Sequence, residues 1–313
     1  MPSPSHSSQT PRFVRIPAVI ALILSALVTS SAPRAIGADG GGEAQADTAP
    51  PVYPGYTLVW GDEFDRDGEP DPKNWTYERG FVRNRELQWY QPANARVANG
   101  LLTIEARRER VVNPGYEAGS PAWQRNREAA EYSSASVITR GLHSWQYGRF
   151  EMRGRIDTRA GSWPAFWTLG TSGQWPHNGE IDIMEYYRGM LLANVAWGGG
   201  KPFEAIWADT RKPIESFNDP DWPKRFHVWR MDWDDRAIVL SVDGATLNSV
   251  ELSRTVNQDT SGANPFHKPH YLLLNLAIGG TQGGDPSNTM FPVRFEVDYV
   301  RVYQTSPKPQ FLR

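Results

Sequence analysis

Cysteine is absent from all 313 residues, so the chain can form neither a disulfide framework nor a lipid anchor through cysteine. The formal net charge of −2 gives no excess of positive charge for nucleic acid or an anionic membrane surface. No long segment holds a helical period, and internal repeats are also absent. We therefore expect no nucleic-acid partner and a fold that its own hydrophobic core must stabilise.

The first 38 residues have the pattern of a secretory signal peptide. Arg12 and Arg15 precede an apolar run over residues 16–28, and small residues follow it up to Ala32. The run is shorter than the roughly 20 residues of a membrane span, so we expect no membrane span. Cleavage after Ala32 or after Ala38 would give a secreted or periplasmic protein. Residues 39–55, rich in Gly, Ala and Pro, read as a flexible linker.

Residues 56–305 are predicted to form one domain, with a tail at 306–313. Apolar and polar residues alternate over 101–106, 147–156 and 295–303, and turn signals such as Asn99-Gly100 separate such segments. Repeated short strands of this kind predict an all-β, antiparallel β-sandwich. The arginines of the 147–156 strand share one face, where they either form a solvated outer surface or meet an acidic glycan.

Three carboxylates lie close together in the stretch 179–187, at Glu180, Asp182 and Glu185. The large apolar residues between them predict a packed strand, in which residues two apart share a face. Glu180 and Asp182 therefore point the same way, whereas the offset to Glu185 is odd. Either Glu185 faces solvent on the other side, or a β-bulge after Asp182 brings all three onto one surface.

The motif Glu180-x-Asp182-x-x-Glu185 resembles the catalytic signature of glycoside hydrolase family 16 in its bulged form, and the similarity extends over about residues 56–303. The resemblance implies a jelly roll of the concanavalin A-like type with a concave glycan-binding cleft. It also implies that Glu180 is the nucleophile, Glu185 the acid and base, and Asp182 an assisting residue in a retaining mechanism.

The same resemblance suggests substrate-binding residues. The segment 84–90 is similar to a family segment along the cleft, which makes Asn84 a candidate sugar ligand. The segment 161–170 is similar to the strand beside the catalytic one, so Trp163, Trp167 and Trp175 are candidates for stacking on sugars. Trp163 and Trp167 are four apart and share a face of a strand.

Two segments depart from the family's laminarinase pattern. Residues 193–200 lack the expected His-Gly pair, and we interpret Trp197 as a sugar platform in its place. Residues 279–286 lack a Trp-Pro-Gly sequence. These departures leave the glycan open, and Arg153, Arg188 and Arg211 are either solvated or serve sulfate groups.

Structural calcium is the one cofactor that the resemblance implies, and none is expected to be catalytic. Glu63, the backbone of Gly100 and Asp298 are the implied ligands, and oxygen ligands suit this ion. The alternative is that both carboxylates simply lie at the rim of the sandwich.

These features together predict a monomeric, exported endo-β-glycanase whose partner is a polysaccharide of the β-1,3-glucan or β-galactan type. A non-catalytic glycan-binding lectin and a transglycosylase on the same scaffold are the alternatives. The intact carboxylate trio argues against a lectin, since a binder needs no acid and nucleophile together.

Overall fold

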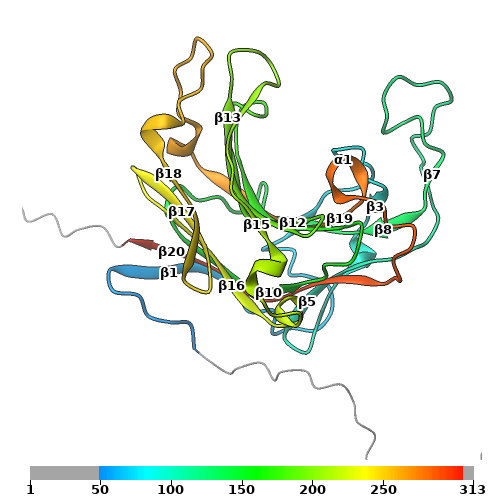
Figure 1. Ribbon diagram of the computed structural model, residues 1–313, viewed down its shortest axis with the longest axis horizontal. Helices are drawn as coiled ribbons and strands as arrows, with labels where there is room; N and C mark the ends of the chain where they lie inside the picture. The colour runs from blue at the N-terminus through cyan, green and yellow to red at the C-terminus, as the bar shows by residue number, and fades with distance from the viewer. Residues whose placement is uncertain (1–48, 306–313) are drawn as a thin grey trace, which may run out of the picture. The chain divides into compact units, whose positions relative to one another are not determined.

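A computed structural model describes residues 49–305, and most of its strands form two large antiparallel sheets (Figure 1). One sheet, called the β10 sheet, has the order β18-β17-β16-β10-β20-β5-β4, with β1 beside β20. Its strands are β1 (Tyr56–Asp62), β4 (Ala95–Ala98), β5 (Leu101–Ala106), β10 (Gly148–Ile156), β16 (His227–Trp233), β17 (Ala237–Val242), β18 (Ala245–Glu251) and β20 (Val293–Thr305).

The other sheet, called the β12 sheet, has the order β14-β13-β12-β11-β19-β9-β2, with β15 beside β13. Its strands are β2 (Thr76–Tyr77), β9 (Ser136–Ile138), β11 (Ser162–Gly170), β12 (Glu180–Tyr187), β13 (Met190–Gly198), β14 (Ala205–Ala208), β15 (Arg211–Pro213) and β19 (His270–Ile278). The antiparallel sandwich expected from the sequence is confirmed.

Several short elements lie outside the two large sheets. Two small sheets pair β3 (Gln88–Tyr90) with β8 (Tyr132–Ser134), and β6 (Val111–Val112) with β7 (Ala129–Ala130). The helical turns are η1 (Pro92–Asn94), η2 (Ile214–Phe217), η3 (Trp222–Lys224), η4 (Leu252–Arg254), η5 (Pro265–His267) and α1 (Gly280–Gly283). None of the helices within residues 49–305 is long and apolar enough to cross a membrane.

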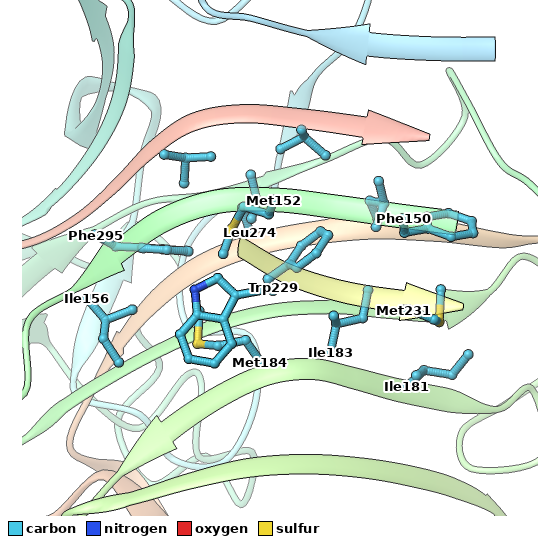
Figure 2. Packing of buried hydrophobic residues seen from close by; sticks show 14 of the residues in the cluster. Phe150, Met152, Ile156, Ile181, Ile183, Met184, Trp229, Met231, Leu274 and Phe295 are labelled. Carbon is cyan, nitrogen blue, oxygen red and sulfur yellow. The ribbon is translucent and has the colours of Figure 1, made fainter. Parts of the chain in front are cut away.

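The core lies between the two sheets and takes every second side chain of each central strand. Figure 2 shows buried side chains from β10 and β16 facing those of β12 across this core. Its labelled residues are Phe150, Met152, Ile156, Ile181, Ile183, Met184, Trp229, Met231, Leu274 and Phe295, all at most 4% exposed. Burying one such side chain contributes about 1.5–3 kcal/mol, so this core can stabilise the fold without disulfides.

The arginines of β10 lie on the opposite face of that strand, where each pairs with a carboxylate of a neighbouring strand. Arg149 Nε donates to Asp232 at 2.7 Å, and Arg153 Nη1 donates to Asp298 at 2.8 Å. Arg155 pairs with Glu296 on β20 in the same way. The arginine row therefore links neighbouring strands, which favours the outer-surface interpretation over an acidic-glycan site.

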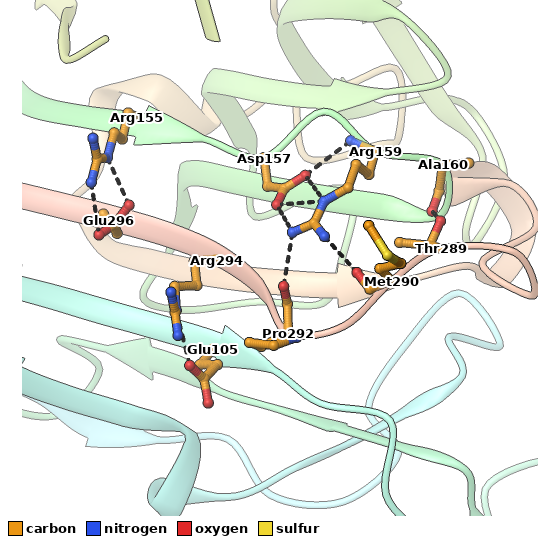
Figure 3. A network of polar contacts seen from close by, with 10 residues as sticks. All are labelled: Glu105, Arg155, Asp157, Arg159, Ala160, Thr289, Met290, Pro292, Arg294 and Glu296. Atoms are coloured by element: carbon orange, nitrogen blue, oxygen red, sulfur yellow. Dashed lines mark hydrogen bonds and ion pairs between the residues drawn. The ribbon is translucent and has the colours of Figure 1, made fainter. Parts of the chain in front are cut away.

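A second polar network fastens the segment before β20 to the loop between β10 and β11 (Figure 3). Arg159 donates to Asp157 and to the carbonyl oxygens of Met290 and Pro292, and Thr289 Oγ1 donates to the carbonyl of Ala160 at 2.6 Å. This loop leads directly into β11, so the network helps to fix the strand that neighbours β12.

The ends of the predicted domain are only partly described. The predicted signal peptide, most of the linker and the tail at 306–313 lie outside the described residues. The last part of the predicted linker already belongs to the fold, because Tyr53 Oη donates to Glu151 at 2.7 Å and its ring packs against Tyr303. The domain was expected to start at Tyr56, but contacts with the rest of the fold already begin at Tyr53.

Candidate active site

A β-bulge in β12 brings the three carboxylates onto one face of the β12 sheet, called here the site face. Asp182 pairs with Asn194 of β13, and the next pair is Glu185 with Leu192, so two residues of β12 oppose one of β13. The two residues of the bulge, Ile183 and Met184, both point into the core (Figure 2). The bulge expected from the odd spacing is confirmed, and it returns Glu185 to the side of Glu180 and Asp182.

Burial sets the protonation behaviour of this trio. Desolvation raises the pKa of Glu180, and it raises the pKa of Glu185 to about 7. The pKa of Asp182 lies well above its ordinary value, first because of burial and then because Glu180 and Glu185 are negatively charged neighbours. Carboxylic acids that hold protons near neutrality are what proton transfer to a leaving group requires.

An indole N–H holds each of the two glutamates. Trp175 Nε1 donates to Glu180 Oε2 at 2.6 Å, and Trp163 Nε1 donates to Glu185 Oε1 at 2.6 Å. The Trp163 ring also packs edge-on against Tyr187, which follows Glu185 by two residues in β12. Trp163 and Trp175, two of the tryptophans predicted to stack on sugars, therefore lie at the site, where their N–H groups orient carboxylates.

Asp182 lies between the glutamates and connects Glu180 to β13. Its side chain hydrogen-bonds Glu180, and it accepts from Asn194 Nδ2 at 3.4 Å. Asn194 is fixed in turn, since its Oδ1 accepts from the backbone N–H of Thr210 at 3.2 Å. This hydrogen bond raises the pKa of Asp182 and lowers the pKa of Glu180, so Asp182 is the donor and favours the ionised form of that glutamate.

Trp167 and Asn84 lie on the β19 side of the trio. Trp167 shares the site face with Ala165, but it is only 6% exposed, and its Nε1 donates to Asn275 Oδ1 at 2.7 Å. Asn84 is exposed in a loop, and its Nδ2 donates weakly to Glu86 Oε1 at 3.4 Å. Sugar binding by these two residues stays a prediction.

Arg83 is a site residue that the sequence did not indicate. Its guanidinium lies 5.0 Å from the ring centroid of Trp167 and pairs with Glu78. Its positive charge lowers the pKa of Glu180 and so opposes the effect of burial. Nothing in the local pattern marks this position, because an arginine in a loop is usually solvated.

The interpretation of Trp197 as a sugar platform is wrong. Glu180 pairs with Ala196 across β12 and β13, so Ala196 shares the site face and the next residue must point the other way. Trp197 accordingly belongs to the hydrophobic core between the sheets. It packs the sandwich from within and is not available to a glycan.

The remaining arginine candidates differ in their surroundings. Arg153 pairs with Asp298, and Arg211 Nε donates to Asp209 at 3.2 Å. Arg188, immediately after β12, lines a pocket of about 360 Å³ together with Arg85, Leu87 and residues of the 280–286 loop. Of the three, Arg188 is the one placed beside the trio's strand without a carboxylate partner among the described residues.

The predicted calcium ligands are engaged with arginines. Both carboxylate oxygens of Glu63 accept from Arg301, at 2.8 and 2.7 Å, and Asp298 pairs with Arg153. Within residues 49–305, no group of three or more His, Cys, Asp or Glu side chains is placed to hold a metal ion. This donor set does not fit calcium as it stands. The ion remains a prediction that a calorimetric calcium titration would test.

The pKa values predict a bell-shaped pH dependence of kcat/KM. The resemblance implies that Glu185 is the acid and must hold its proton, so activity should fall as the pH rises through about 7. It also implies that Glu180 is the nucleophile and must be ionised, so activity should fall at low pH as well. Trp163→Phe removes a donor that stabilises the Glu185 carboxylate, so its pKa should rise and the alkaline limb should move to higher pH.

Trp175→Phe is the matched control for that experiment. It removes the equivalent donor to Glu180, which should move the acidic limb to higher pH and leave the alkaline limb in place. An alkaline limb that does not move in Trp163→Phe would contradict the assignment of Glu185 as the group titrating near neutrality.

Known proteins resemble the chain over most of its length. The model of the glycosyl hydrolases family 16 matches residues 85–301. The β-glucanase of Rhodothermus marinus is 38% identical over 268 residues, which cover 80% of this chain and 86% of the relative. Glucan endo-1,3-β-glucosidase A1 of Niallia circulans is 32% identical, and the match covers 81% of this chain and 39% of that longer protein.

Solved structures have the same fold. One, reported in a study of endo-acting O-glycanases with which human gut bacteria initiate mucin breakdown, has a TM-score of 0.74 and 34% identity. It covers 82% of this chain and 94% of its own. With the carboxylate trio in place, the chain is an endo-acting glycoside hydrolase and belongs to the glycosyl hydrolases family 16.

Proposed function

We propose that the enzyme hydrolyses internal β-1,3-linkages of a glucan by a retaining double displacement. The observation that supports this is the trio on one face of β12, where an indole N–H donates to each of Glu180 and Glu185. Asp182 hydrogen-bonds Glu180 and so favours different protonation states for the two glutamates. Relatives named for β-1,3-glucan hydrolysis favour glucan as the substrate.

In the first step, Glu185 gives its proton to the glycosidic oxygen while Glu180 attacks the anomeric carbon. The bond to the leaving sugar breaks, and an ester forms between Glu180 and the remaining sugar. In the second step, Glu185 takes a proton from water, whose oxygen attacks the same carbon and releases Glu180. Asp182 assists both steps by donating to Glu180 whenever that carboxylate carries negative charge.

A screen of laminarin, mixed-linkage glucan, agarose, carrageenan and β-1,3-galactan tests the proposal. We expect new reducing ends from laminarin, with oligosaccharides rather than single sugars as early products, and the β-anomer as the first product seen by NMR. Absence of hydrolysis on every glycan would refute the function. An α-anomer would refute retention, and products longer than the input would indicate transglycosylation.

A mucin-type glycan is the second candidate. The structure with a TM-score of 0.74 comes from the study of endo-acting O-glycanases. This chain also departs from the laminarinase pattern at 193–200 and 279–286. Mucin O-glycans therefore belong in the same screen, and release of oligosaccharides from mucin alone would favour this candidate over glucan.

We also propose that the protein is exported. The support is the pattern of residues 1–38, with Arg12 and Arg15 before an apolar run. N-terminal sequencing of protein recovered outside the cytoplasm should begin after Ala32 or Ala38. An intact N-terminus on cytoplasmic protein would overturn the assignment.

A further inference from the structure

Trp207 differs from the other tryptophans in its exposure. All 13 tryptophans lie within the described residues, and Trp207 is the one whose side chain is exposed, at 43%. Its indole has no hydrogen bond, ring contact or cation contact within residues 49–305. Single exposed apolar residues are common and need no explanation by themselves, so the position of Trp207 decides what it can do.

The strand register places Trp207 on the site face. In β14, Ile206 and Ala208 pack against the core, so Trp207 between them points the opposite way. Trp207 pairs with Ala196 of β13, which pairs with Glu180 of β12. The three residues form one row across the same face, and two strand spacings put the β14 and β12 backbones roughly 10 Å apart.

The backbone around Trp207 is fixed from both ends of β14. Asn248 Nδ2 donates to the carbonyl oxygens of Ala208 and Ala193, at 3.0 and 2.8 Å. At the other end, the N–H of Gly198 donates to Asn257 Oδ1 at 2.7 Å. A Cβ at position 198 would lie 2.3 Å from the His177 ring, so this hairpin is closely packed. The indole is therefore presented on a rigid support, which lowers the entropic cost of binding.

We propose that Trp207 is a sugar-binding platform for a pyranose ring that is not itself at the bond being cleaved. A flat indole with a free face offers apolar contact, and its free N–H offers a donor to a hydroxyl. The roughly 10 Å between the β14 and β12 backbones places this contact beyond the sugar that Glu180 attacks, on the β13 and β14 side of the trio. The inference rests on the proposed function, because it assumes that a glycan lies across this face.

Glycan length provides the test. With laminari-oligosaccharides from the disaccharide to the heptasaccharide, Trp207→Ala should lower kcat/KM about tenfold on the long members, mainly through KM. The shortest substrates that the enzyme cleaves should show no change, because they do not reach the platform. Trp207→Phe should restore most of the loss, since it keeps a flat ring. Equal loss at every length, or no loss, would overturn the inference.

Binding measured without turnover separates this inference from the proposed function. In a Glu180→Gln background, calorimetric titration with laminariheptaose should show about tenfold weaker binding when Trp207→Ala is added. Leu58→Ala removes an exposed apolar side chain from the β10 sheet and should leave binding unchanged. Failure of wild-type hydrolysis on every glycan would refute the function. An unchanged dissociation constant in the double variant would refute the Trp207 platform.

Discussion

Glu180→Gln should abolish hydrolysis while glycan binding survives. The amide cannot form the ester with the anomeric carbon, and loss of a nucleophile typically costs at least about 10⁴-fold in kcat. The change is nearly isosteric, so Trp175 Nε1 keeps an oxygen partner at position 180. The measurement is the release of reducing ends from laminarin, with binding followed by calorimetric titration.

Glu251→Gln is the matched control, because Glu251 is exposed on β18 of the other sheet and the same substitution there leaves the site unchanged. It should retain wild-type rates. Retained activity in Glu180→Gln would remove Glu180 from the mechanism. Loss of binding together with activity would instead indicate that the substitution disrupts the site as a whole.

The bulge could be predicted as one of two alternatives, because it reconciles the carboxylates with the apolar residues between them. Strict alternation from Glu180 would put Ile183 on the core side and Met184 beside the carboxylates. The same alternation would point Glu185 toward the core, where an ionised carboxylate is costly. Placing Ile183 and Met184 together in the core satisfies both requirements, and the register between Asp182 and Glu185 has this form.

The direction of Trp197 could not be obtained in the same way. Its face depends on how β12 and β13 pair across the turn at Arg188 and Gly189, and a shift of one residue in that pairing reverses every side chain. Trp207 was missed for the related reason that β14 has only four residues. So short a strand has too little alternation to reveal which face meets the core.

The ion pairs of Glu63 and Asp298 could not be predicted from the sequence either. Arg301 is only 3% exposed, yet a charged residue in an alternating strand reads as solvent-facing. Its bidentate contact with Glu63 joins β20 to the end of β1, 238 residues apart in the sequence. Such contacts depend on which strands become neighbours, which local patterns do not specify.

Glu185→Gln should lose activity in a way that depends on the leaving group. On laminarin the loss should be about 10³-fold, because general acid catalysis typically contributes 10²–10⁴-fold and glutamine has no proton to give. An aryl glycoside with a dinitrophenol leaving group needs no protonation, so its first step should be much less affected.

Glu180→Gln is the internal comparison for this experiment, because the loss of a nucleophile should affect both kinds of substrate alike. The alkaline limb of the pH profile, set by the Glu185 pKa of about 7, should also disappear from the residual activity of Glu185→Gln. Equal losses on laminarin and on the aryl glycoside would show that Glu185 is not the acid. A persisting alkaline limb would mean that another carboxyl group on this face supplies the proton, with Asp182 the first candidate because its pKa lies well above its ordinary value.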